Sequence, residues 1–93
     1  MKILIKDQEN KGFAMARIEN KRAGVMTYLK PSPEYIIIEH TIVEPEFKGK
    51  GVAKKLLNKV VDMARENNLK IEPECSYAAA MFKKLPDIQD VLK

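Results

Sequence analysis

The 93-residue sequence has a single cysteine, no tryptophan and no long apolar run. Because Cys75 is the only thiol, the chain can form neither an internal disulfide nor a zinc site built from cysteines. No stretch approaches the roughly 18 apolar residues of a membrane helix, and the first residues lack the apolar core of a signal peptide. A lone thiol is typical of a reducing compartment. The sequence therefore predicts a soluble, cytoplasmic protein.

The composition is typical of one compact domain, which we expect to span residues 1–93, with 45% hydrophobic and 32% charged residues. The net charge of +4 favours an anionic partner such as a phosphate-bearing cofactor or a nucleic acid, although a lysine-rich surface also serves solubility alone. The three tyrosines and three phenylalanines form no paired stacking motif. Nucleic-acid binding is therefore the weaker of these two interpretations.

The first half of the chain shows the alternation of apolar and polar residues that is typical of strands. Turn clusters that contain Gly12 and Gly24 separate the first three segments, and Gly12 is expected to provide a positive φ. Pro31 and Pro33 should end the third strand, since proline cannot donate a ladder hydrogen bond. A β-branched segment then predicts a strand in the interior of the sheet. The expected strands cover residues 2–7, 13–18, 25–29 and 35–43.

The second half changes to a helical period. Residues 52–68 form a strongly amphipathic helix, residues 69–71 a short strand, and residues 76–85 a second helix. A right-handed crossover should place the last strand parallel to the fourth. The predicted fold class is therefore α/β (α+β): a four-stranded antiparallel meander, then a helix, a parallel strand and a C-terminal helix.

Two glycines, Gly49 and Gly51, lie between the interior strand and the first helix. Glycines at this place let the backbone approach a ligand closely, and the helix start offers free N–H groups and a favourable dipole. Lys48, Lys50 and Lys54 add positive charge, so the segment favours a phosphate group. The spacing fits neither a Walker loop nor a dinucleotide fingerprint. A simpler interpretation is that the glycines only permit a tight strand-to-helix turn.

The segment from Val43 to Leu57 resembles the cofactor motif of the GNAT N-acetyltransferase superfamily, R/Q-x-x-G-x-G/A, with Lys48, Gly51 and Ala53 at the defined positions. His40-Thr41 before it and Cys75-Ser76-Tyr77 after it resemble a small subfamily of single-domain acetyltransferase-like proteins. The resemblance covers nearly the whole chain and implies a minimal GNAT-like fold.

The resemblance also implies a cofactor, acetyl-CoA, and the residues that hold it. The backbone of Ile42 and Val43 would pair with the pantetheine arm, and the loop would hold the pyrophosphate. The implied loop residues are Lys48, Gly49, Lys50, Gly51, Val52, Ala53 and Lys54.

For catalysis, the resemblance implies His40 as base and Cys75 as a group near the CoA sulfur. In larger relatives a tyrosine protonates the leaving thiolate, and here Phe82 takes its place, so Cys75 is the candidate acid or covalent nucleophile. A buried structural cysteine and a structural histidine are the simpler alternatives. By strict alternation, Glu39 and His40 should point to opposite faces, with His40 beside Ile38.

The family's helices between its first two strands are missing, because residues 8–11 leave only a tight turn. The acceptor is therefore expected to be a large, exposed amine, for example on a protein. The alternative is a CoA-binding regulatory module without catalysis.

Overall fold

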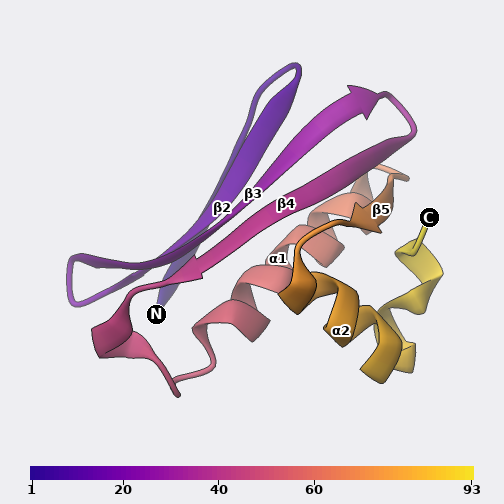
Figure 1. Ribbon diagram of the computed structural model, residues 1–93. Coiled ribbons are helices and arrows are strands. Elements are labelled where there is room, and N and C mark those ends of the chain that lie inside the picture. Colours follow the sequence, from indigo (N-terminus) through magenta and orange to yellow (C-terminus); the bar gives the residue numbers. More distant parts are fainter.

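The computed structural model describes residues 1–93, in which a five-stranded sheet carries two helices and two short 3-10 segments (Figure 1). The strands lie in the order β1-β2-β3-β4-β5; β1 to β4 form an antiparallel meander and β5 pairs parallel to β4. This confirms the predicted fold class. No helix of the structure has the length and apolar character needed to cross a membrane. The elements are β1 Lys2–Asp7, β2 Lys11–Ile18, β3 Lys21–Ser32, β4 Tyr35–Val43, η1 Pro45–Phe47, α1 Val52–Glu66, β5 Lys70–Pro73, α2 Ser76–Lys84 and η2 Pro86–Val91.

Three details of the meander differ from the sequence prediction. The turn between β2 and β3 is only Glu19-Asn20, both with positive φ, so Gly24 lies inside β3. Gly12 has no positive φ and lies in β2, where a Cβ would collide with the Tyr28 hydroxyl group. Pro31 lies within β3, at an irregularity where the ladder with β4 is interrupted, so it needs no ladder donor there.

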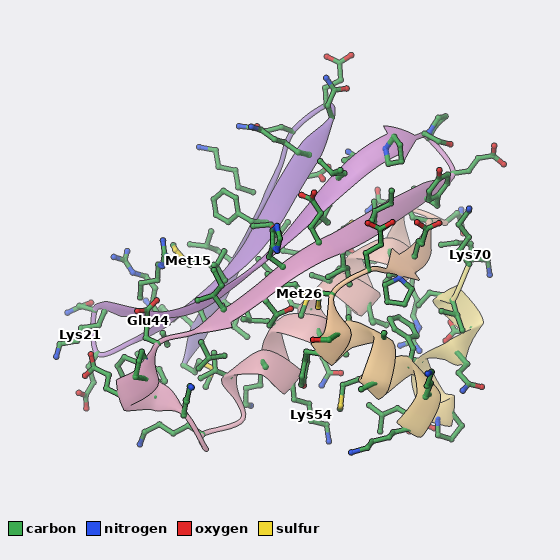
Figure 2. The ribbon with its side chains drawn as sticks, in the orientation of Figure 1. Met15, Lys21, Met26, Glu44, Lys54 and Lys70 are labelled. Carbon is green, nitrogen blue, oxygen red and sulfur yellow. The ribbon has the colours of Figure 1, made fainter.

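The core lies between α1 and the sheet face that it covers. The apolar stripe of α1, including Leu56 and Val60, packs against β-strand side chains such as Met26 and Ile38, and all four are fully buried. In Figure 2, Met26 points toward α1, whereas Met15 lies on the other side of the strands. No helix covers the opposite face of β1 to β4, which we call the open face, and its side chains remain partly exposed.

An irregularity in β4 changes which way its side chains point. Tyr28 of β3 pairs with Ile38, but the next residue back, Thr27, pairs with His40, so Glu39 is an extra residue and forms a β-bulge. Paired residues share a face of the sheet. His40 therefore shares the open face with Thr27, not the buried face with Ile38. The expected strict alternation of β4 is wrong, because the bulge shifts it by one residue.

A polar cluster fixes the β1–β2 end of the sheet. The Tyr28 side chain lies across Gly12 and its hydroxyl donates to Asp7 Oδ1 at 2.7 Å, while Lys30 Nζ donates to Asp7 Oδ2 at 2.9 Å. Burial alone would raise the pKa of Asp7, but the two hydrogen bonds outweigh it and lower that pKa below its ordinary value of 3.8. The carboxylate form of Asp7 therefore stabilises the fold.

This cluster predicts a pH dependence of stability. Because the folded-state pKa of Asp7 lies below the unfolded value, its contribution is complete above pH 3.8 and is lost as the pH falls through the folded pKa. We expect the free energy of unfolding of Asp7→Asn to fall less steeply below pH 3.8 than that of the wild type. Urea unfolding at a series of pH values measures this, with Glu9→Gln as control in the same turn. Parallel curves for Asp7→Asn and wild type would contradict it.

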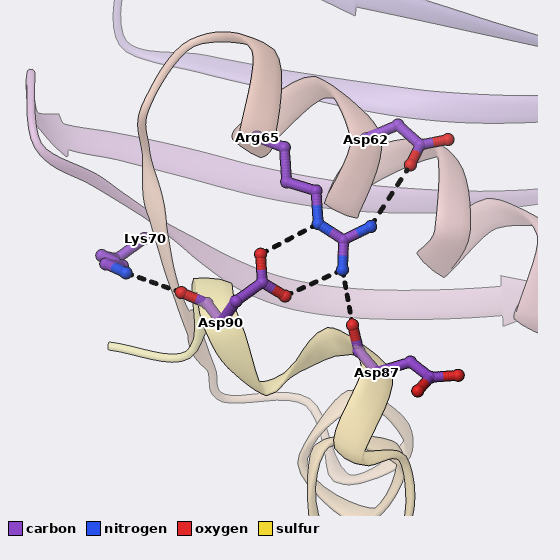
Figure 3. A network of polar contacts seen from close by, with 5 residues as sticks. All are labelled: Asp62, Arg65, Lys70, Asp87 and Asp90. Carbon is purple, nitrogen blue, oxygen red and sulfur yellow. Dashed lines mark hydrogen bonds and ion pairs between the residues drawn. The ribbon is translucent and has the colours of Figure 1, made fainter.

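The C-terminal segment is fastened to α1 and β5. Arg65 of α1 donates to both Asp90 carboxylate oxygens, at 3.0 and 2.8 Å, and to the carbonyl of Asp87 (Figure 3). Beyond η2, Leu92 forms a parallel bridge with Ile71, and the N–H of the last residue donates to the Ile71 carbonyl at 2.9 Å. The tail therefore lies along the outer edge of β5.

Candidate functional site

The glycine segment between β4 and α1 presents a row of free backbone donors. Gly49 and Gly51 have positive φ, 80° and 76°, a conformation that glycine adopts readily. The first backbone bond of α1 runs from the Lys55 N–H to the Gly51 carbonyl at 3.1 Å. None of the N–H groups from Gly49 to Lys54 donates to a protein acceptor. A helix start of this kind binds anions.

The surroundings of this loop also suit a phosphate group. A Cβ at Gly49 or Gly51 would meet nothing within 4 Å, so the backbone is open to a ligand. Lys48, Lys50 and Lys54 are exposed around it. A cavity of about 350 Å³ opens beside the loop; its lining includes Val43, Phe47, the loop glycines, Lys54 and Tyr77. Of the predicted loop residues, Val52 offers only its backbone, since its side chain is in the core.

The end of β4 presents further unpaired backbone groups. The β4–β5 ladder stops at Ile38, whose carbonyl accepts from the N–H groups of Glu74 and Cys75. On the β3 side, the N–H of Glu44 donates to Ala23 at 2.8 Å, and antiparallel bonding alternates from residue to residue. By this alternation the backbone N–H and C=O groups of Ile42 point toward β3. Those of Thr41 and Val43 point away from β3, into the space past the end of β5, where β4 has no neighbouring strand. Binding of the pantetheine arm at Ile42 and Val43 stays a prediction. Thr41 and Val43 are the pair whose backbone groups point away from β3 and are free to bind it.

Cys75 lies at the start of α2, across this gap from β4. Its Sγ accepts a hydrogen bond from the Ala78 N–H at 3.3 Å and lies 3.2 Å from Thr41 Oγ1. The residue is partly buried and packs against the apolar core, so its role near the CoA sulfur stays a prediction. Thr41 reaches it only because the bulge turns that side chain to the helix-covered side.

Tyr77 lies between the glycine segment and the end of β4. A second cavity, of about 260 Å³, is lined by residues of the β4 end and the α2 start: Glu39, His40, Thr41, Ile42, Cys75, Ser76 and Tyr77. Tyr77 also lines the cavity of the glycine segment, so it borders both cavities. Burial raises the pKa of Tyr77, and the neighbouring Cys75 adds to the rise, so its hydroxyl stays protonated.

Glu39 and His40 stand where the second cavity meets a third. The third cavity, of about 470 Å³, lies on the open face and shares both residues with the second. Sequence alternation predicted opposite faces for the two residues, whereas the bulge lets both of them line the same two cavities. Glu39 and Thr41 are the functional candidates that sequence alternation missed. A run of adjacent polar residues in an otherwise apolar strand was the only signal.

Phe82 is the residue that the resemblance aligns with a catalytic tyrosine of larger relatives. Its side chain is only 2% exposed and belongs to the apolar core. It lines none of the three cavities described above. A hydroxyl group at this position would therefore not reach the candidate site.

Comparison with known proteins identifies the family. The model of the GCN5-related N-acetyltransferase family matches residues 12–91. The solution structure of a GCN5-like protein from Staphylococcus aureus is 44% identical, with a TM-score of 0.72; the match covers 97% of this chain and 87% of that one. No curated protein matches the chain.

Two solved structures of larger proteins are also similar. A Bacillus anthracis protein assigned as a streptothricin acetyltransferase, in complex with acetyl coenzyme A, is 26% identical with a TM-score of 0.67, over 84% of this chain and 47% of that one. An IAA acetyltransferase from Bacillus cereus is 25% identical with a TM-score of 0.66, over 81% and 53%. This chain thus spans about half of each, and the Bacillus anthracis protein holds acetyl coenzyme A. The chain belongs to the GCN5-related N-acetyltransferase family.

Proposed function

We propose that this protein transfers the acetyl group of acetyl-CoA to a small-molecule amine. The observation that carries the proposal is the series of three neighbouring cavities, from the glycine segment past Tyr77 to the open face. Each holds groups suited to one part of the reaction. The donor's phosphates, its thioester and the acceptor amine would occupy them in that order.

The glycine segment would hold the pyrophosphate. Six consecutive N–H groups, from Gly49 to Lys54, lack protein acceptors, and Lys48, Lys50 and Lys54 supply compensating charge. The free backbone groups of Thr41 and Val43 would bind the amide groups of the pantetheine arm.

Bound acetyl-CoA supplies the thioester whose carbonyl carbon the amine nitrogen attacks, with loss of the CoA sulfur. Glu39 and His40, at the bulge, would take the protons that the attacking ammonium gives up. Cys75, held by the Ala78 N–H and Thr41, would give a proton to the departing sulfur. Deprotonated Cys75 would then regain its proton from solvent.

Gly51→Val tests the cofactor loop. Valine at a φ of 76° is strained by about 1–3 kcal/mol, so acetyl-CoA affinity should fall roughly 10–100-fold if the loop must keep this conformation to bind. Gly51→Asn is the matched control, because asparagine tolerates positive φ and should retain most of the affinity. Calorimetric titration with acetyl-CoA measures both. Equal affinities in the two variants and the wild type would refute binding at this loop.

A turnover assay distinguishes the enzyme from a non-catalytic CoA-binding module. We expect acetyl-CoA to be consumed only when an amine is present, with release of free CoA. Mass spectrometry of the intact protein should show no acetylated Cys75; accumulation of that adduct would instead make Cys75 the nucleophile of a two-step reaction. Tight binding with no acetyl transfer to a broad panel of amines would favour the regulatory module.

A further inference from the structure

The open-face cavity is large enough to enclose a small molecule. Its volume of about 470 Å³ is in the range of small-ligand sites, although no helix stands between β1 and β2. It extends from the β1–β2 turn across β2 and β3 to the bulge in β4. The lining residues are Gln8, Lys11, Gly12, Phe13, Thr27, Tyr28, Leu29, Glu39 and His40.

The cavity carries two opposite charges that the protein leaves unpaired. Lys11 on β2 and Glu39 on β4 take part in none of the ion pairs of the structure, either with each other or with other residues. Lys30, by contrast, is already paired with Asp7 at 2.9 Å. Two strand spacings separate β2 from β4, so the two backbones lie roughly 10 Å apart. A short ligand could meet both side chains at once.

The surface between these charges is mostly apolar. Phe13 and Leu29 line it, and Leu29 is 37% exposed. Thr27 lies beneath the cavity, paired with His40 across the ladder, and its buried Oγ1 has no hydrogen-bond partner. Such a surface suits an alkyl chain that joins two polar ends.

We infer that the acceptor is an amino acid in the broad sense, a short apolar chain with an amine at one end and a carboxylate at the other. The inference rests on the proposed function and names its acceptor class. The ammonium group lies beside Glu39 and His40, where it loses its protons, and the carboxylate lies beside Lys11. A diamine would place a like charge against Lys11, which disfavours it.

Three amines of equal chain length test this directly: 5-aminopentanoate, pentylamine and 1,5-diaminopentane. In the wild type, kcat/KM should be highest for 5-aminopentanoate, by about 3-fold or more over pentylamine, and lowest for the diamine. Lys11→Glu should reverse the order and make the diamine the best acceptor. Lys2→Glu is the matched control, since it makes the same charge change on β1 outside the cavity lining and should leave the order unchanged.

Equal kcat/KM values for the three amines, or an unchanged order in Lys11→Glu, would overturn the inference while the acetyltransferase function stands. If no amine is acetylated, NMR titration of the protein saturated with CoA decides the matter. Amide shifts at Lys11, Phe13 and Leu29 with 5-aminopentanoate but not with the diamine would support this chemical class as the ligand of the cavity, while the proposed acetyl transfer would be refuted. Absence of those shifts would overturn the inference as well.

Discussion

Combining Glu39→Gln with His40→Ala is expected to lower kcat for acetyl transfer by about 10²–10⁴-fold, the usual contribution of general acid–base catalysis. The reason is the bulge in β4, which brings both side chains to the junction of the thioester and acceptor cavities. A variant that changes only one of the two residues still keeps the other as a proton acceptor. Each single variant should therefore lose much less activity than the double variant. Steady-state rates over a range of pH measure the effect.

The controls for this prediction are binding and stability. Glu39 is partly exposed and His40 is exposed, and neither forms a side-chain hydrogen bond or ion pair in the structure. Acetyl-CoA affinity and the urea midpoint of the double variant should therefore match those of the wild type. A double variant that keeps more than about a third of the wild-type kcat would show that another group takes the proton.

Phe82→Ala should cost about 3–5 kcal/mol of unfolding free energy, because it removes a large side chain that is only 2% exposed. A domain of this size has only about 5–15 kcal/mol in total, so the variant should be marginal at room temperature. Urea unfolding measures the loss. Phe82→Leu is the control that keeps an apolar side chain, and we expect it to lose less than half as much. A loss below about 1 kcal/mol for Phe82→Ala would contradict the packing described here.

Phe82→Tyr separates this structural role from the family's catalytic one. If the site merely lacked its usual acid, restoring the tyrosine would raise turnover. The structure instead places the ring in the core, where an added hydroxyl without a partner costs about 1–3 kcal/mol. We therefore expect lower stability and no gain in kcat.

Local patterns predicted the elements well where the residues themselves determine the backbone. The amphipathic stripe and the glycines before it predicted the start of α1, which begins at Val52, and the positive φ values of Gly49 and Gly51 follow from residue type. The β-branched run predicted β4 with its observed bounds, Tyr35–Val43. Each of these signals lies within about a dozen neighbouring residues.

Features that depend on partners far away in the sequence were not predictable. The bulge at Glu39 exists only relative to β3, and two adjacent polar residues give no sign of which one is extra. The contact between Thr41 and Cys75 joins residues 34 positions apart. The acceptor cavity likewise forms from the β1–β2 turn and three strands. The alternation of apolar and polar residues therefore could not predict on which face of the sheet Glu39, His40 and Thr41 lie.

The C-terminal tail has a consequence for handling the protein in solution. An unpaired strand edge can recruit a strand from a second molecule, which leads to aggregation. Here Leu92 and Lys93 occupy part of the outer edge of β5, where the last N–H binds Ile71. The opposite edge is β1, whose Lys2 and Lys6 side chains repel a second copy. Any change that displaces Leu92 and Lys93 from this edge would therefore leave β5 open to intermolecular pairing.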